Sequence, residues 1–201
     1  YKTVEKVKKH LAMIFHRFIE EDNLQIYVNK NLLEAWNPFI RQNPATMELA
    51  CEELFDGKTI VSIEPYILPH KTKFEDEEAF KKAGGAKDWL AHQGFYVYRN
   101  RRLIVYGTWF GKFKKEPAYN LARIKLDMSS ESDFEWGIDI KKSKATLPVS
   151  IEESVIQIAY LAIEKSVAVY NSRGVYNRRN TGNNTSLKYV WEQRKNSSGN
   201  Y

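Results

Sequence analysis

Hydrophobic and polar residues alternate most clearly over residues 94–111, and this stretch predicts a β-hairpin. Aromatic and β-branched residues recur with period two on both sides of a short polar run, as in paired strands. The polar run is Arg99-Asn100-Arg101-Arg102, and asparagine tolerates the left-handed backbone that tight hairpin turns require. We therefore expect this hairpin to be the element around which the domain is organised.

Apolar positions spaced three and four residues apart predict a helix at each end of the folded region. Residues 2–20 form an amphipathic pattern with a lysine-rich outer face. Pro148 opens the second helix, in which Ser150 is the expected N-cap. Its apolar positions continue to about residue 171 and are broad enough to pack on a sheet.

Two shorter segments also have a helical pattern. Residues 47–55 are expected to form one or two helical turns, with the single cysteine, Cys51, buried and inert among them. Residues 76–82 are expected to form a short helix inside the charged insert at 69–93.

The remaining alternating segments predict strands at residues 24–30, 58–68, 119–128 and 134–140. Pro65 lies inside the second of these, which indicates a sheet edge or a bulge, because proline cannot donate a hydrogen bond to a neighbouring strand. The order of helix, strands, charged insert, hairpin, strands and helix predicts an α+β domain.

Composition is that of a folded domain rather than of a disordered or membrane protein. The chain has 201 residues, of which 43% are hydrophobic and 13% aromatic, enough for a sizeable core. It contains no run of membrane-spanning length and no signal-peptide pattern, so we expect a cytoplasmic protein without a membrane partner.

The chain divides by composition into three parts. Residues 1–22 are expected to connect from an upstream domain, 23–172 to form the folded domain, and 173–201 to form a polar tail or linker rich in glycine, serine and asparagine. Because the sequence begins without methionine, we interpret it as part of a longer protein.

Three lysines in one short loop are the sharpest candidates for chemistry. Lys141, Lys142 and Lys144 follow a predicted strand and precede the final helix, so their ammonium groups cluster near one end of the sheet and can reach a phosphate. A solvated basic loop is the alternative interpretation. No histidine–cysteine cluster is present, so we expect no metal site.

A second basic set suggests contact with nucleic acid. The formal net charge is +6, and aromatic residues interleave with basic ones in a manner that suits phosphate contacts and base stacking. The basic residues of this set are Arg99, Arg101, Arg102, Lys112, Lys114 and Lys115. Burial of the strand aromatics in the core is the alternative.

Two motifs together resemble a known family. Residues 94–104, Gly-Phe-Tyr-Val-Tyr-Arg-Asn-Arg-Arg-Leu-Ile, and residues 136–145, Trp-Gly-Ile-Asp-Ile-Lys-Lys-Ser-Lys-Ala, resemble the transducer, or second, domain of bacterial GHKL ATPases. These are ATPases similar to histidine kinases, gyrase B and heat-shock chaperones, with MutL and MORC as relatives. The helix at residues 10–18 and the segment 36–39 also resemble this group, and the similarity runs from about residue 8 to residue 172.

The resemblance implies a fold and a role. The fold would be like the second domain of ribosomal protein S-five, a mostly antiparallel sheet with a left-handed βαβ unit, backed by helices. A lysine of the transducer loop would contact the γ-phosphate of ATP held with Mg²⁺ in the upstream ATPase domain. Lys142 is the favoured residue, with Lys141 and Lys144 as alternatives.

The chain also departs from the family pattern. Neither the Glu-x-x-x-Asn-x-x-Asp helix nor the Asp-x-Gly-x-Gly lid occurs, so this chain alone is expected neither to bind nor to hydrolyse ATP. The first hypothesis is a transducer fragment that couples ATP binding to dimerisation or to action on DNA, in DNA metabolism, restriction–modification or phage defence. The second is a freestanding nucleic-acid-binding module, and a structural interaction domain is a third.

Overall fold

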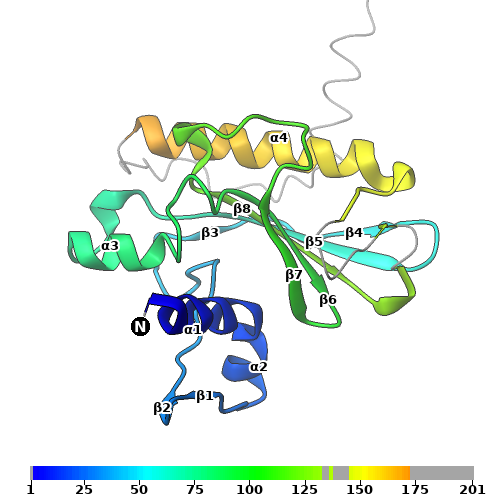
Figure 1. The fold of residues 1–201 in the computed structure, drawn as a ribbon. Coiled ribbons are helices and arrows are strands. Elements are labelled where there is room, and N and C mark those ends of the chain that lie inside the picture. The colour runs from blue at the N-terminus through cyan, green and yellow to red at the C-terminus, as the bar shows by residue number, and fades with distance from the viewer. Residues whose placement is uncertain (1, 133–135, 138–144, 173–201) are drawn as a thin grey trace, which may run out of the picture.

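The computed structural model describes residues 2–132, 136–137 and 145–172, and Figure 1 shows a sheet between two helical layers. The helices are α1 (Lys2–Ile14), α2 (His16–Glu21), α3 (Glu77–Ala83) and α4 (Val149–Asn171), with 3-10 turns at Lys71–Lys73, Pro117–Tyr119 and Ser130–Ser132. The strands are β1 (Tyr27–Val28), β2 (Asn31–Leu32), β3 (Met47–Glu48), β4 (Glu52–Phe55), β5 (Ile60–Ile67), β6 (Gly94–Arg99), β7 (Arg102–Thr108) and β8 (Ala122–Met128).

Six of these strands form one sheet. Five follow the order β3-β5-β8-β6-β7, and the sixth, β4, pairs with β5 along the same edge as β3. The β6–β8 pair is parallel and the other pairs are antiparallel. The mixed, mostly antiparallel sheet with packed helices confirms the predicted α+β class. The chain passes from β6 to its parallel neighbour β8 through β7 and a 3-10 turn, so no α-helix joins this pair.

One face of the sheet is apolar and is covered by α4 (Figure 1). Because side chains alternate along a strand, Ile63, Val97 and Ile124 all point to this face, where they are fully buried. Val155 and Ala159 of α4 are equally buried and belong to the same hydrophobic cluster. Burial of this apolar surface supplies the main favourable free energy of folding.

The opposite face is aromatic and polar, and α1, α2 and the segment that follows them cover it (Figure 1). Tyr66, Tyr96 and Tyr98 alternate with the apolar residues of their strands and are buried here with Phe39 and Met13. The two-stranded β1–β2 ribbon extends beyond this layer, outside the large sheet.

The predicted hairpin is confirmed as β6 and β7. Asn100 and Arg101 have positive φ angles of 47° and 69° at the turn, as the polar run predicts. The register shifts twice along the pair, which adds twist. At Gly107, with φ of 62°, a Cβ atom would lie 2.2 Å from the carbonyl oxygen of Ala91, so only glycine fits.

The helical prediction for residues 47–55 is wrong. These residues form β3 and β4, which both pair with β5, and Cys51 between them is exposed rather than buried. Tertiary pairing with a strongly apolar neighbour overrides local helical pattern. The pairing with β5 is interrupted between β3 and β4, opposite Pro65, and this interruption is the bulge that Pro65 predicts. The Pro65 carbonyl accepts a hydrogen bond from the Leu49 amide at 2.9 Å. The nitrogen and the carbonyl of one strand residue point to the same side, so the proline nitrogen, which carries no hydrogen, also lies on the side of the interruption.

The helix predictions need two further corrections. The helix expected at 2–20 breaks at Phe15, whose φ and ψ of −108° and 13° separate α1 from α2. Ser150 does not cap α4, because its hydroxyl donates to the Asp56 carbonyl at 2.6 Å and Pro148 occupies the N-cap position. The short helix near 76–82 is confirmed as α3, capped by Asp76.

Strand lengths also differ from the sequence prediction. The strand expected at 24–30 is reduced to β1, whereas β5 and β8 lie within their predicted ranges. The strand predicted at 134–140 lies mostly outside the residues that the structure describes, and the tail at 173–201 lies wholly outside them. None of the helices within the described ranges combines the length and apolar character that a membrane span requires.

Candidate functional site

The three candidate lysines, Lys141, Lys142 and Lys144, lie outside the residues that the structure describes. The two flanks of their loop are described, and they lie side by side. The Thr146 amide donates to the Trp136 carbonyl at 2.8 Å, and the Thr146 hydroxyl donates to the same oxygen at 3.1 Å. The two described flanks of the lysine segment are therefore joined to each other by hydrogen bonds.

Asp56 anchors this loop to the sheet. Its carboxylate, which is 2% exposed, accepts hydrogen bonds from the indole Nε1 of Trp136 at 3.1 Å and from the Lys58 and Thr59 amides at 2.9 Å. Its carbonyl accepts the Ser150 hydroxyl at the start of α4. The turn between β4 and β5 thus joins one flank of the lysine loop to the helix that follows it.

The electrostatics of Asp56 favour an ionised anchor. Burial raises the pKa of the carboxyl, but hydrogen bonds from Ser132, the two turn amides and Trp136 outweigh burial and hold the pKa below its ordinary value. The Ser132 hydroxyl also lies 2.6 Å from that of Thr59. Asp56 is not among the candidate site residues of the sequence analysis, because its partners Trp136 and Ser150 are distant along the chain.

The arginine turn of the hairpin reaches the same end of the sheet. The Asn100 amide donates to the Met128 carbonyl at 3.0 Å, and its side chain accepts from the Ser130 amide at 3.1 Å. Ser129, next to Ser130, places its hydroxyl 3.5 Å from that of Thr59. A chain of contacts therefore connects the hairpin turn with the Asp56 turn.

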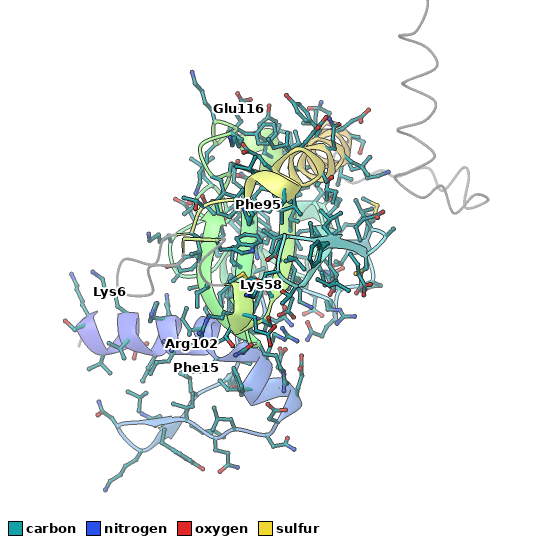
Figure 2. The ribbon with its side chains drawn as sticks, turned by 90° about the vertical axis from the view of Figure 1, so that its right-hand side faces the viewer. Lys6, Phe15, Lys58, Phe95, Arg102 and Glu116 are labelled. Atoms are coloured by element: carbon teal, nitrogen blue, oxygen red, sulfur yellow. The ribbon has the colours of Figure 1, made fainter. Side chains whose placement is uncertain are left out.

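The arginines of this turn contact the α1–α2 layer. Arg101 forms ion pairs with Glu21 at 2.5 Å and Asp22 at 3.0 Å, and its guanidinium lies 5.4 Å from the Phe18 ring. Arg102 is exposed and lies 5.4 Å from the ring of Phe15. Figure 2 shows Arg102 and Phe15 close together where α1 meets the sheet, with Lys6 at the far end of α1. Arg99 ends β6 and is half-buried.

The other basic residues of the predicted set lie elsewhere. Lys112 pairs with Glu152 of α4, on the opposite face of the sheet. Lys115 donates to the Ala91 carbonyl at 2.8 Å. Lys114 is exposed and forms no hydrogen bond or ion pair with any residue that the structure describes. The structure therefore does not gather the six residues into one surface.

A polar network joins α2 to the sheet. His16 Nε2 lies 2.8 Å from the Tyr98 hydroxyl, and Arg17 pairs with Asp127 of β8 at 2.5 Å. Glu20 accepts a hydrogen bond from the Asn37 amide at 2.9 Å. Burial raises the pKa of Glu20, and its contacts with His16 and Asn37 lower it by more, so its pKa lies below the ordinary value. Charged and polar groups, rather than apolar ones, thus position this helix.

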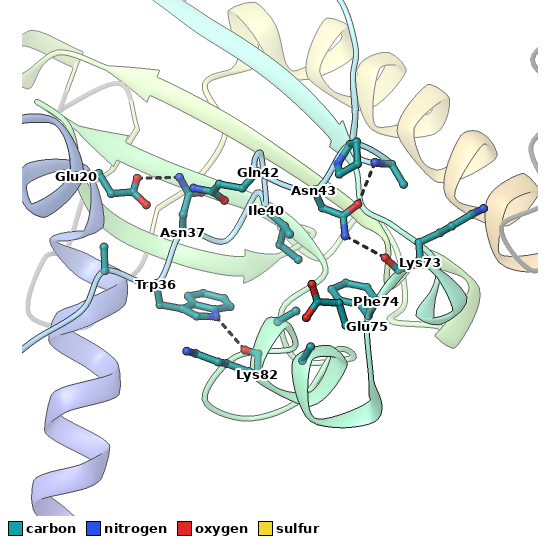
Figure 3. Close-up of a pocket in the computed structure, with 15 residues that line it drawn as sticks. Glu20, Trp36, Asn37, Ile40, Gln42, Asn43, Lys73, Phe74, Glu75 and Lys82 are labelled. Atoms are coloured by element: carbon teal, nitrogen blue, oxygen red, sulfur yellow. Dashed lines mark hydrogen bonds between the residues drawn. The ribbon is translucent and has the colours of Figure 1, made fainter.

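An open groove of about 700 Å³ lies between this network and α3 (Figure 3). Trp36, Ile40 and Phe74 form apolar parts of its lining, and charged side chains also line it. The Trp36 indole donates to the Lys82 carbonyl at 3.1 Å, which joins the two walls of the groove.

In the part of the chain that is described, no three histidine, cysteine or carboxylate side chains converge as metal ligands. Comparison of the chain with family models, with curated proteins and with solved structures found no match. The functional argument therefore rests on the geometry of the anchored loop, the hairpin turn and the α1–α2 layer.

Proposed function

We propose that this chain is the transducer module of a GHKL-type ATPase, with a fold like the second domain of ribosomal protein S-five. In this proposal ATP and Mg²⁺ are held by an upstream domain of the same protein, and this chain supplies a lysine to the γ-phosphate. Lys142 is the favoured lysine, and Lys141 and Lys144 are its alternatives.

The observation that carries the proposal is the anchoring of the lysine loop. A side chain that meets a phosphate only in one conformational state must be carried on a positioned support. Asp56 provides such a support, because it binds the Trp136 flank of the loop and the start of α4 together. A loop that was merely solvated would not require a buried carboxylate at its base.

The α1–α2 layer supports the second part of the proposal, coupling to an upstream domain. Besides the apolar contacts of Met13, it contacts the sheet through ion pairs and hydrogen bonds, such as Arg17–Asp127 and His16–Tyr98. Such contacts are specific in direction and can exchange partners, whereas an interdigitated apolar interface resists displacement. The layer is thus suited to transmit movement from a neighbouring domain to the sheet.

The partners in this proposal follow from the resemblance. They are the upstream ATPase domain, a second copy of the protein in a dimer, and DNA, within DNA metabolism or phage defence. A freestanding nucleic-acid-binding module remains the second candidate, supported by the exposed Arg102 and Lys114. The distribution of the basic set over two faces of the sheet favours the first candidate.

The test is steady-state ATPase activity of the longer protein with Lys141→Ala, Lys142→Ala and Lys144→Ala. A charge-assisted hydrogen bond is worth about 1.5–3 kcal/mol, so we expect Lys142→Ala to reduce turnover by roughly one to two orders of magnitude at unchanged melting temperature. Lys114→Ala is the matched control for loss of an exposed lysine. Full activity in all three loop variants, or loss only in step with melting temperature, would contradict the proposal.

A further inference from the structure

Arg123 is a buried cation that pairs with no carboxylate in the part of the chain that the structure describes. It lies on β8 and is 0% exposed, and its Nη1 donates to the Pro38 carbonyl. Its Nε and Nη2 atoms have no hydrogen-bond partner among the described residues. Uncompensated buried charge is strongly unfavourable, and burial lowers the pKa of this guanidinium accordingly.

Three aromatic rings surround this guanidinium. Its Cζ lies 5.2 Å from the ring of Trp89, 5.5 Å from that of Trp36 and 5.9 Å from that of Tyr96. Cation–π contacts of this kind are favourable, and more so when they are shielded from water. They offset part of the cost of burial but leave the N–H groups of Nε and Nη2 without an acceptor among the described residues.

His92 adds another unsatisfied atom to the same cluster. It is 0% exposed, and its ring centroid lies 5.0 Å from that of Trp36. The Tyr96 hydroxyl donates to the His92 carbonyl at 2.8 Å, so the Nδ1–Oη contact at 3.1 Å must use a proton on Nδ1. The neutral ring then presents an unprotonated Nε2, which has no hydrogen-bond partner within the described ranges.

The charges around His92 are mostly positive. Burial is the largest cause that lowers the pKa of His92, and together with the charges of Arg123, Lys115 and Lys87 it brings that pKa to about 3, against the raising effect of the Asp88 carboxylate. A bridging water could satisfy the unpaired atoms of Arg123 and His92. A water would not neutralise this local charge, whereas an anion would.

We propose that Arg123 and His92, beneath Trp36, form a binding site for a small oxyanion, either a phosphate group or a carboxylate. The guanidinium fork offers two N–H donors to two oxygens, and His92 contributes a third donor once it takes up a proton at Nε2. This site is separate from the lysine loop and does not depend on the proposed ATPase function.

The groove of Figure 3 supplies the route to this site. Trp36 lines the groove on one side and contacts Arg123 on the other. Lys73 and Lys82 also line the groove and attract anions, against the carboxylates of Glu20 and Glu75. Gly85 packs closely on the cluster, since a Cβ atom there would lie 2.7 Å from Trp36 and 2.9 Å from His92 Nε2. In this proposal the anion enters from the groove when the Trp36 indole leaves its hydrogen bond to the Lys82 carbonyl.

The experiment follows the imidazole nitrogens of the 201-residue chain by NMR during titration with sodium phosphate, sodium acetate or sodium chloride at constant ionic strength. We expect a saturable shift of His92 Nε2 with an oxyanion and none with chloride. His10, His16 and His70 serve as internal references. A response to phosphate alone identifies a phosphate-bearing ligand, and a response to acetate as well identifies a site that also accepts carboxylates.

Variants test the role of the guanidinium. Arg123→Met should abolish the shift, and Arg123→Lys, which keeps the charge without the fork, should weaken binding roughly ten- to hundred-fold. Lys114→Ala should bind as the unsubstituted chain does. If Arg123→Met fails to fold, the titration of the unsubstituted chain still decides. A His92 signal unmoved by both oxyanions, or one moved equally in Arg123→Met, would overturn the proposal and assign the cluster to a bridging water.

Discussion

The two faces of the sheet are built from the same strands but are held by different forces. On the α4 face, fully buried apolar side chains such as Ile124 and Val155 fill one cluster. On the α1–α2 face, buried tyrosines carry hydroxyl groups, and charged pairs such as Arg17–Asp127 join the layers. The first kind of contact is apolar packing, and the second adds hydrogen bonds and ion pairs that fix how the α1–α2 layer is placed on the sheet.

The largest expected effect comes from breaking the apolar face. Ile124→Ala removes buried methyl groups at the centre of β8 and leaves a cavity, so it should lower the free energy of unfolding by about 2–5 kcal/mol. Urea denaturation measures this change. Val149→Ala is the control, because Val149 is 89% exposed and its loss should leave stability within about 0.5 kcal/mol.

The next largest effect should come from Asp56, the polar exception on the α4 side. Asp56→Asn leaves an amide N–H group facing the Trp136 indole donor, so unfolding should become easier by about 1–3 kcal/mol. Denaturant melts of the single variant provide the measurement. An unchanged melt would show that the carboxylate does not anchor the loop.

The pH dependence of the same residue has a defined sign. Because the folded-state pKa of Asp56 lies below its ordinary value of 3.8, its contribution to stability is full above that value and is lost as the pH falls through the folded pKa. Below about pH 4, the stability of the unsubstituted chain should therefore fall more steeply with decreasing pH than that of Asp56→Asn. Denaturant melts at a series of pH values measure this difference. Parallel curves would contradict the assignment.

A smaller effect is expected from the charged contact between the layers. Arg17→Met and Asp127→Asn should give a coupling free energy of about 1 kcal/mol in a double-mutant cycle, reduced by salt. Hydrogen exchange should show faster opening of α2 in either variant, with the amides of β5 and β8 unchanged. Equal acceleration on both sides would mean that the two faces unfold as one unit.

The smallest effect is expected at the hairpin turn. Arg101→Ala removes exposed ion pairs with Glu21 and Asp22, so the melting temperature should not change measurably. Hydrogen exchange in the last turn of α2 should nevertheless become faster, and high salt should produce a similar change in the unsubstituted chain. Lys114→Ala should leave that exchange rate unchanged.

Local elements could be predicted from the sequence, and elements decided by distant partners could not. The hairpin and α3 depend on neighbouring residues, such as Asn100 at the turn and Asp76 at the cap. Residues 47–55 have a helical pattern, but their pairing with β5 makes them strands. Arg123 occupies a position on β8 that the pattern marks as polar, and only the return of Trp36 and Trp89 to the same place buries it.

The candidate site shows the same division. The lysine loop was recognised from its own residues, and its position relative to phosphate remains a prediction. The anchor of this loop could not be predicted from the sequence, because Asp56 and Trp136 are 80 residues apart. No periodic pattern links a turn carboxylate to an indole so far along the chain.

The interrupted pairing opposite Pro65 has a consequence for association between molecules. Edge strands with long runs of free N–H and C=O groups invite pairing with other chains. Here the edge is divided into two short strands, and Glu48, Glu52 and Glu53 add negative charge along it. A strand of a second copy would find the edge interrupted between β3 and β4, and its own glutamates would be repelled by those of the first copy. This side of the sheet therefore resists strand-to-strand aggregation.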